Sequence, residues 1–259
     1  MTDPGLEPRP DLMLTAIGGG YLRNPVRTRR ITCVDCATPV DGYDQCFPCK
    51  SHRSRTGLAD ATAFLTYAIA SQKSGLVMRG YKARPPVAEH RQVVGLLLLV
   101  ALEGHTQCIE TLTGSAVTHW AVVPSLPPKP WVHPLRSLVA GRVKGSEVPL
   151  VSAPTVSQPR AVNADHFTCN VRMTPESHVL LIDDTWTTGG HAQSAVLALR
   201  KAGAGRVSVL VVARWLKEDY GGNRLFIADL VSRVINSVSN LVDFGDGRNW
   251  PPEGAFDAD

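Results

Sequence analysis

The sequence predicts an α/β fold: a parallel sheet flanked by helices, with a small zinc-ribbon module near the N-terminus. Residues 179–182 are a continuous apolar run, residues 206–213 are a second strand-like segment rich in Val, and a helical pattern lies between them. A strand–helix–strand unit of this kind makes a right-handed crossover between parallel strands. Four cysteines in two C-x-x-C pairs precede this region and indicate the separate module. The chain has 259 residues, 44% of them hydrophobic, which is enough for one such domain and a small addition.

We divide the chain into four parts. Residues 1–30 are rich in Pro, Gly and Arg without a regular period, so we expect a largely mobile arm. Residues 31–53 form the zinc-ribbon module, and residues 54–240 form the α/β domain. Residues 241–259 are an acidic tail rich in Gly and Pro, which we expect to be poorly ordered at its end. The net charge of +4 suits an anionic ligand without requiring nucleic acid.

Helical spacing of apolar residues predicts a first helix from about 57 to 73 and a second from about 88 to 112. Residues 93–102 of the second helix are its longest apolar run. Because crossing a membrane takes about 20 such residues, we expect a buried helix and no membrane association. The N-terminus lacks the basic and apolar regions of a signal peptide. We therefore expect a soluble cytoplasmic protein.

The second half of the chain alternates strands and loops. Residues 119–123 predict a strand that ends at Pro124, and residues 125–134 predict a loop because they contain four prolines. The apolar run 179–182 is typical of a parallel strand covered on both faces. A helix over 191–202 stops at Gly203, and residues 206–213 form the next strand.

The cysteine spacing predicts a structural zinc site. Cys33 and Cys36 form one C-x-x-C pair, and Cys46 and Cys49 form the other. Four thiolates on two turns suit tetrahedral Zn²⁺, and four protein ligands leave no open position for catalysis. Such pairs also indicate a reducing compartment rather than a disulfide framework. The alternative is a loop with four unligated thiols.

The segment after residue 182 predicts a pocket for a sugar phosphate. Asp183 and Asp184 come first, and a Thr/Gly-rich loop then leads into the helix. The carboxyl end of a parallel strand is where open sheets bind ligands, and a helix start offers unpaired N–H groups to phosphate. Carboxylates accept hydrogen bonds from sugar hydroxyls. The alternative is that both dipeptides, Asp-Asp and Gly-Gly, serve only the turn.

This stretch resembles the phosphoribosyl pyrophosphate (PRPP) signature of type I phosphoribosyltransferases. The resemblance implies that the two aspartates hold the ribose hydroxyls, that the loop wraps the 5′-phosphate, and that Mg²⁺ sits on the pyrophosphate. His191 stands where that family usually has Thr or Ser. The PRPP-binding residues implied are Asp183, Asp184, Thr185, Thr187, Thr188, Gly189, Gly190, His191 and, in a pyrophosphate loop, Ser125.

Together the two motifs resemble the ComF family, which joins an N-terminal zinc ribbon to a phosphoribosyltransferase domain. Gly80-Tyr81-Lys82 looks like the Y-K element of that family, and Val122-Val123-Pro124-Ser125 looks like its pyrophosphate loop. Arg160, Asn163 and Phe167 look like its R-x-x-N stretch with the following Phe. The R-G-x-N-Q segment of the family is missing, and residues 130–134 stand near its place.

The resemblance implies transfer of phosphoribosyl to a nitrogen nucleophile. Asp183, Asp184, Lys82 and Lys129 are the candidate catalytic residues, with the lysines as cations for the leaving pyrophosphate. Three alternatives stay open: a non-catalytic PRPP or nucleotide sensor, a DNA-uptake accessory protein, and a structural zinc module with a vestigial domain. The sequence identifies neither the acceptor nor the oligomeric state.

Overall fold

A computed structural model describes residues 9–18, 20–232 and 243–245. Within these residues, six strands form one sheet in the order β3-β2-β6-β7-β1-β8. Neighbouring strands are parallel except β8, which runs antiparallel to β1. The strands are β1 (Ala61–Ile69), β2 (His119–Val122), β3 (Ser146–Glu147), β6 (His178–Trp186), β7 (Arg206–Leu216) and β8 (Asp243–Gly245).

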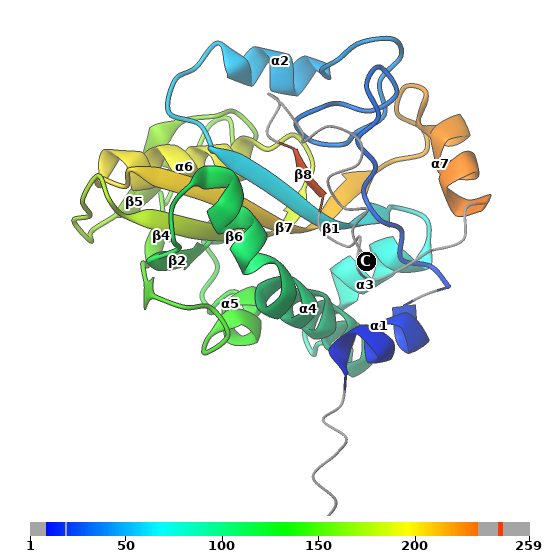
Figure 1. The fold of residues 1–259 in the computed structure, drawn as a ribbon, viewed down its shortest axis with the longest axis horizontal. Coiled ribbons are helices and arrows are strands. Elements are labelled where there is room, and N and C mark those ends of the chain that lie inside the picture. The colour runs from blue at the N-terminus through cyan, green and yellow to red at the C-terminus, as the bar shows by residue number, and fades with distance from the viewer. Residues whose placement is uncertain (1–8, 19, 233–242, 246–259) are drawn as a thin grey trace, which may run out of the picture.

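Helices cover both faces of this sheet (Figure 1). A separate antiparallel pair is made by β4 (Leu150–Ser152) and β5 (Phe167–Cys169). The helices are α1 (Pro10–Gly18), α2 (Phe47–Arg53), α3 (Lys73–Gly80), α4 (Ala88–Thr113), α5 (Pro134–Val139), the short 3₁₀ helix η1 (Ala164–His166), α6 (Gly190–Lys201) and α7 (Asn223–Ser232). The fold is thus the predicted sheet between helical layers, and it is parallel except at the edge strand β8.

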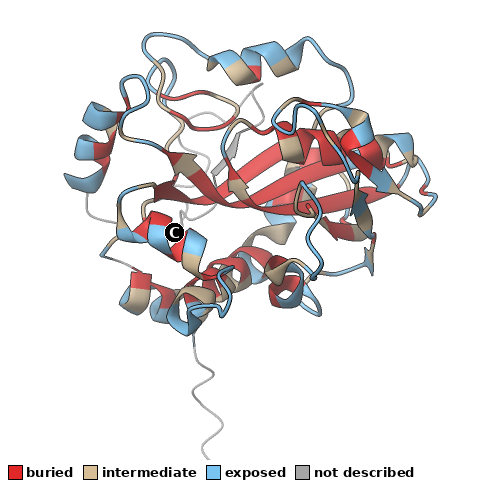
Figure 2. Ribbon diagram, turned by 180° about the vertical axis from the view of Figure 1, so that it is seen from behind, coloured by how far each residue is buried: buried red, intermediate tan, exposed pale blue. Residues whose placement is uncertain are grey.

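Alternation along the strands divides the core in two, because successive side chains of a strand point to opposite faces. Leu210 and Val212 of β7 pack with α1, α3, α4 and α5 on one face. Val209 and Val211 pack on the other face with α6 and with three of the four clustered cysteines. Burial is highest in the strands themselves (Figure 2). The cysteine module therefore shares a hydrophobic core with the sheet.

The predicted strand–helix–strand unit is confirmed as β6, α6 and β7. The strand predicted over 179–182 is longer than expected, since β6 stays in register with β7 as far as Trp186 opposite Arg214. Asp183 and Asp184 consequently belong to the strand, and the loop that follows them spans only residues 187–189. The helix over 88–112 and the strand over 119–123 are confirmed as α4 and β2.

The helix predicted from 57 to 73 is wrong, because this segment forms β1. All nine residues of β1 are buried, between β7 on one side and β8 on the other. A run that is apolar on both sides fits helical and extended periods equally well. Thr62, Phe64 and Tyr67 belong to the β-branched and aromatic types that favour a strand buried on both faces.

The prediction that residues 1–30 form a largely mobile arm is also wrong for their described part. Helix α1 packs on α4, and Leu14 is buried in that contact. After α1, the carbonyl of Arg23 accepts hydrogen bonds from the backbone N–H and the side chain of two β1 residues, Tyr67 and Thr66. Leu14 and these hydrogen bonds hold the segment against the domain. Residues 1–8 lie outside the described residues.

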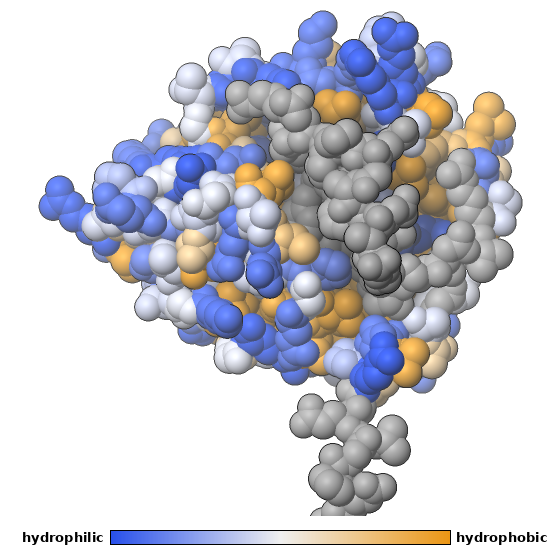
Figure 3. Space-filling model, in the orientation of Figure 1, coloured by the Kyte–Doolittle hydropathy of each residue, from blue (hydrophilic) through white to orange (hydrophobic). Residues whose placement is uncertain are grey.

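Of the tail predicted over 241–259, residues 243–245 form β8 and the rest lies outside the described residues. Among the described helices, α4 alone is long and apolar enough to cross a membrane, with a hydropathy of 1.4. It contacts α1, α3 and the sheet, and nine of its residues are buried. That is the packing of a core helix. On the face shown in Figure 3, hydrophilic and apolar residues are interspersed over the described surface.

Candidate functional site

The two aspartates lie at the carboxyl edge of the sheet, where parallel strands present their ligand-binding ends. Asp183 and Asp184 are 8% and 7% exposed near the end of β6. Strand β2 runs parallel to β6 with Val122 beside Ile182, so Ser125 follows at the same edge. The short loop 187–189 then leads into α6. This arrangement agrees with the predicted order of carboxylates, loop and helix start.

Asp184 receives side chains from two distant segments. Its Oδ2 accepts a hydrogen bond of 2.6 Å from the hydroxyl of Tyr81 and one of 2.7 Å from Nζ of Lys82. Nε2 of His133 lies 3.5 Å from the same oxygen. Tyr81 and Lys82 reach it because α3 follows β1 directly and ends at the carboxyl edge, and His133 does so because it begins α5. The tertiary fold therefore surrounds Asp184 with proton donors.

His133 is held in one tautomer by the start of α5. The backbone N–H of Leu135 donates to its Nδ1 at 3.2 Å. A ring nitrogen that accepts carries no proton, so in the neutral ring the proton sits on Nε2, which faces Asp184. His133 thus caps a helix and directs an N–H toward the carboxylate.

The two neighbouring carboxyl groups have opposite electrostatic environments. Burial, and then the charge of Asp184, raises the pKa of Asp183 to about 8. Burial also acts against ionisation of Asp184, but Lys82 and His133 hold its pKa well below the usual range. Oδ1 of Asp183 accepts a hydrogen bond of 2.8 Å from the backbone N–H of Asp184. The pair consequently carries close to one negative charge at neutral pH, located on Asp184.

The loop 187–189 depends on glycine for two reasons. Gly189 has a φ of +86°, and a Cβ there would lie 2.2 Å from Cζ2 of Trp186. A Cβ on Gly190 would lie 2.0 Å from the carbonyl oxygen of Arg160. Glycine adopts the positive φ of residue 189 readily, and only a residue without a Cβ fits at position 190 against the carbonyl of Arg160. The backbone amides at the start of α6 are in this way packed against the segment around Arg160.

Three polar atoms beside this loop are buried without a hydrogen-bond partner among the described residues. They are Oγ1 of Thr185, Nε1 of Trp186 and Nε2 of His191. Buried polar groups are normally paired, so unpaired ones next to a glycine loop are available to a ligand. Burial, the largest influence, lowers the pKa of His191. Thr187 is exposed and Thr188 is half-buried in the same loop.

The two candidate lysines have different positions. Lys82 forms an ion pair with Asp184, whereas Lys129 is exposed and forms no ion pair with any described residue. Ser125 is half-buried, and its carbonyl accepts a hydrogen bond of 2.7 Å from Ser152. The structure therefore brings Lys82 to the aspartates and leaves Lys129 in solvent.

Sequence reasoning missed the roles of Tyr81 and His133 at Asp184. It also missed a pair beside them, in which the guanidinium of Arg84 lies 3.8 Å from the ring centroid of Trp131. Arg84 follows Lys82 by two residues and Trp131 precedes His133 by two, so this pair ties the same two segments together. The only signal in the sequence was the Tyr-Lys pair, since proline-rich loops rarely reveal what they contact.

The four clustered cysteines are placed to bind a metal. Their four Sγ atoms all lie within 4.8 Å of one another, and those of Cys36 and Cys46 are 3.7 Å apart. Tetrahedral zinc with Zn–S bonds of about 2.3 Å requires S–S separations of about 3.8 Å. Hydrogen bonds from the other three thiols, and the nearby charge of Arg214, lower the pKa of Cys36 well below its ordinary value. The cluster thus fits a closed, structural metal site.

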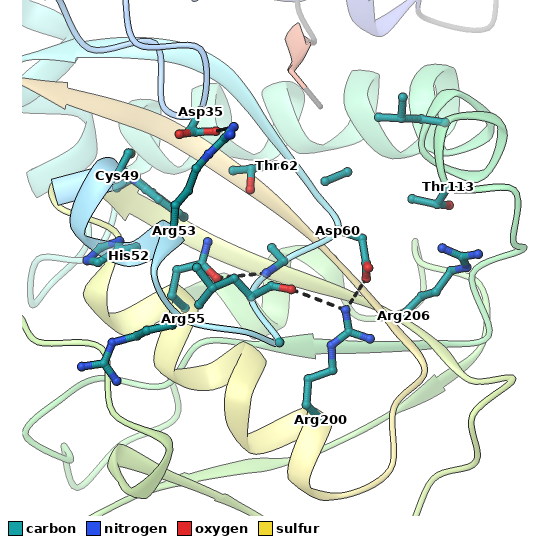
Figure 4. A pocket seen from close by; sticks show the side chains of 17 residues that line it. Asp35, Cys49, His52, Arg53, Arg55, Asp60, Thr62, Thr113, Arg200 and Arg206 are labelled. Atoms are coloured by element: carbon teal, nitrogen blue, oxygen red, sulfur yellow. Dashed lines mark hydrogen bonds and ion pairs between the residues drawn. The ribbon is translucent and has the colours of Figure 1, made fainter. Parts of the chain in front are cut away.

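A cavity of about 610 Å³ lies between α2 and the start of β1 (Figure 4). Arginines line it, but Arg53 pairs with Asp35 at 2.7 Å and Arg200 pairs with Asp60 at 2.6 Å. These ion pairs neutralise two of the four arginines, while the other two, Arg55 and Arg206, are exposed. None of the residues predicted to bind PRPP lines this cavity.

No protein-family model and no curated protein matches this chain. Solved structures that resemble it distantly include two adenine phosphoribosyltransferases. Adenine phosphoribosyltransferase from Leishmania tarentolae has 17% identity and a TM-score of 0.35, covering 61% of this chain and 92% of its own. The adenine phosphoribosyltransferase from Leishmania donovani has 14% identity and a TM-score of 0.34, covering 62% and 85%. Likeness at this level assigns no activity, so the functional argument rests on the site.

Proposed function

We propose that the chain binds PRPP with Mg²⁺ at the carboxyl edge of its sheet and acts as a phosphoribosyltransferase-like protein. One observation carries the proposal. A buried pair of carboxylates is followed, two residues later, by a glycine-dependent loop at a helix start, with Lys82 donating to one carboxylate at 2.7 Å. Acceptors for ribose hydroxyls and donors for a phosphate thereby lie next to each other.

Each residue has a role in this proposal. Asp184, kept ionised by Lys82 and His133, accepts hydrogen bonds from the ribose hydroxyls, while protonated Asp183 can also donate one. The amides of residues 187–191 bind the 5′-phosphate, with the hydroxyls of the loop threonines and the ring of His191. Ser125 lies at the end of β2 on the pyrophosphate side.

In the proposed reaction, the bond from C1 of the ribose to the pyrophosphate oxygen breaks. A bond from C1 to a nitrogen nucleophile forms, and the nucleophile loses a proton. Magnesium, when bound with the pyrophosphate, would supply positive charge against the charge that develops on the leaving group. Lys82 is the cation placed to assist. The contribution of the protein is mainly positioning and electrostatic stabilisation.

The test is calorimetry with PRPP–Mg²⁺ on the wild type and on the double variant Asp183→Asn/Asp184→Asn. We expect the double variant to lose binding while keeping its circular-dichroism spectrum. Asp165→Asn, which changes an acid whose side chain is 79% exposed, is the matched control and should bind normally. Equal affinity of the double variant and the wild type would contradict the assignment of the pocket.

A non-catalytic PRPP sensor is the second candidate. It is favoured by the loop 126–134, which lacks the family's R-G-x-N-Q segment and leaves Lys129 in solvent. Such a protein would bind PRPP without releasing pyrophosphate from it. A pyrophosphate-release assay across nucleobases and amines separates the two candidates.

A further inference from the structure

Arg214 is a buried cation that contacts both the cysteine module and the strand leading to the phosphate loop. It lies near the end of β7 and is 5% exposed. Its Nε donates a hydrogen bond of 2.8 Å to the carbonyl of Cys36. Its Nη1 donates to the carbonyls of Trp186 at 2.9 Å and Trp215 at 2.7 Å. One side chain thus joins a metal-binding turn to the last residue before the loop 187–189.

The charge of Arg214 needs a counter-charge. It forms no ion pair with a carboxylate in the part of the chain that the structure describes, and its hydrogen-bond partners are neutral carbonyls. A buried guanidinium without an opposite charge is costly. Four thiolates around a divalent metal carry net negative charge, and Cys36 supplies one of them. A filled metal site and the buried guanidinium therefore stabilise each other.

On its other side, Arg214 contacts Trp186, the residue that precedes the loop 187–189. The indole of Trp186 is 3% exposed and packs edge-on against Phe64, with ring centroids 5.5 Å apart. The same indole leaves no space for a Cβ on Gly189. Trp186 and Gly189 are consequently packed against each other, so a shift of the indole toward the loop would displace Gly189.

We propose that Arg214 is a positioning residue through which metal in the cysteine cluster sets the phosphate loop, so that zinc and sugar phosphate bind cooperatively. This inference rests on the proposed function, because it assigns the loop 187–189 to a phosphate. Coupling between two sites is reciprocal, so each ligand must raise the affinity of the other by the same factor.

Tyr67 provides a matched control. Its hydroxyl donates a hydrogen bond of 2.7 Å to the carbonyl of Ala37, one residue beyond Cys36. It therefore ties the same turn to the sheet, and Tyr67→Phe removes only this hydroxyl while keeping the aromatic ring at its position opposite Arg214 in the sheet. Loss of this hydroxyl should weaken the module without affecting the link.

The first measurement is zinc release from the full chain to a chromogenic chelator, with and without saturating PRPP–Mg²⁺. We expect PRPP to slow release by about tenfold, within the usual range of coupling between sites. Arg214→Lys keeps the positive charge but loses the several N–H donors of the guanidinium. In this variant the ratio of the zinc-release rates without and with PRPP–Mg²⁺ should be at least about threefold smaller than in the wild type. Tyr67→Phe should release zinc faster yet keep the wild-type ratio. Arg214→Gln repeats the test if the lysine variant folds poorly.

The second measurement needs no sugar phosphate. Hydrogen exchange of the amides of residues 187–191 is compared in zinc-loaded wild type, Arg214→Lys and Tyr67→Phe. We expect faster exchange in Arg214→Lys only. If the wild type does not bind PRPP, the proposed function fails and this measurement still decides the link. Unchanged exchange in Arg214→Lys, or an undiminished effect of PRPP on its zinc release, would overturn the inference.

Discussion

Asp183 and Asp184 are identical residues with opposite behaviour. In a strand, adjacent side chains point to opposite faces, so only Asp184 reaches Tyr81, Lys82 and His133. Burial and the charge of Asp184 outweigh the charge of Lys82 at Asp183 and raise its pKa to about 8. The alternation of the strand thereby produces one ionised acid and one protonated acid.

The raised pKa of Asp183 predicts how stability depends on pH. The unfolded chain releases this proton near pH 4, whereas the folded chain keeps it until about pH 8, so the wild type loses stability as pH rises through that window. Asn cannot ionise. We therefore expect Asp183→Asn to gain at least ~1 kcal/mol over the wild type between pH 5 and pH 9, about 2–4 °C in melting temperature.

Thermal denaturation at the two pH values checks this expectation. The exposed Asp165→Asn serves as control and should show no pH-dependent difference from the wild type. A constant difference between Asp183→Asn and the wild type across this pH range would show that Asp183 is ionised at neutral pH.

The two candidate lysines allow a paired prediction. Lys82→Met removes the ion pair with Asp184 and leaves the methylenes in place, so we expect PRPP–Mg²⁺ affinity to fall about tenfold. Lys129→Met changes an exposed side chain without an ion pair to any described residue, and should alter affinity less than twofold. Calorimetry measures the PRPP–Mg²⁺ affinity of both variants. Equal losses of affinity in the two would show that Lys82 has no special role in binding.

At the scale of elements, the unit β6–loop–α6 depends on register. Pairing of β6 with β7 continues to Trp186, which fixes the start of the loop, and Gly190 begins α6 against the carbonyl of Arg160. The loop therefore has little freedom before a ligand arrives. A preorganised set of amides binds an anion at a low entropic cost.

Gly189→Ala tests that loop. The new methyl group would meet Trp186 at a φ of +86°, so we expect at least about tenfold weaker PRPP binding with the sheet intact. Gly141→Ala is the matched control, since its φ is +78° and no atom lies within 4 Å of the added Cβ. It carries the same backbone strain at a site remote from the loop, and should leave affinity unchanged. Normal PRPP binding by Gly189→Ala would exclude a role for the loop geometry.

At the scale of the whole molecule, the cysteine module and the sheet share one core. Cys33, Cys36 and Cys49 are buried with Phe64 and the apolar face of α6. Metal in the cluster should for this reason stabilise the domain as well as the module.

We expect the purified protein to contain about one zinc per chain, and chelation to lower its melting temperature. Cys46→Ser should reproduce the loss of zinc, because it removes one of four ligands. Cys108→Ser replaces an exposed thiol on α4 and should retain the metal. Metal analysis combined with thermal denaturation measures both effects. A full zinc content in Cys46→Ser would reject the four-cysteine site.

The sequence by itself determined the local features of this protein. Two C-x-x-C pairs bring four thiols together, and a buried strand followed by Asp-Asp, a Thr/Gly loop and a helix defines the candidate phosphate site. Such features depend on spacing within a short segment, and spacing is visible in a sequence. The unit β6–α6–β7 and the long buried helix α4 were predictable for the same reason.

Only the tertiary structure decided the rest. It made residues 61–69 a central strand, packed α1 on α4, and brought Lys82 rather than Lys129 to Asp184. It also placed Arg214 between Cys36 and Trp186. These contacts join segments that are far apart in the chain, and their energies come from burial and charge in a shared core. Local periodicity carries no information about which distant segments will meet.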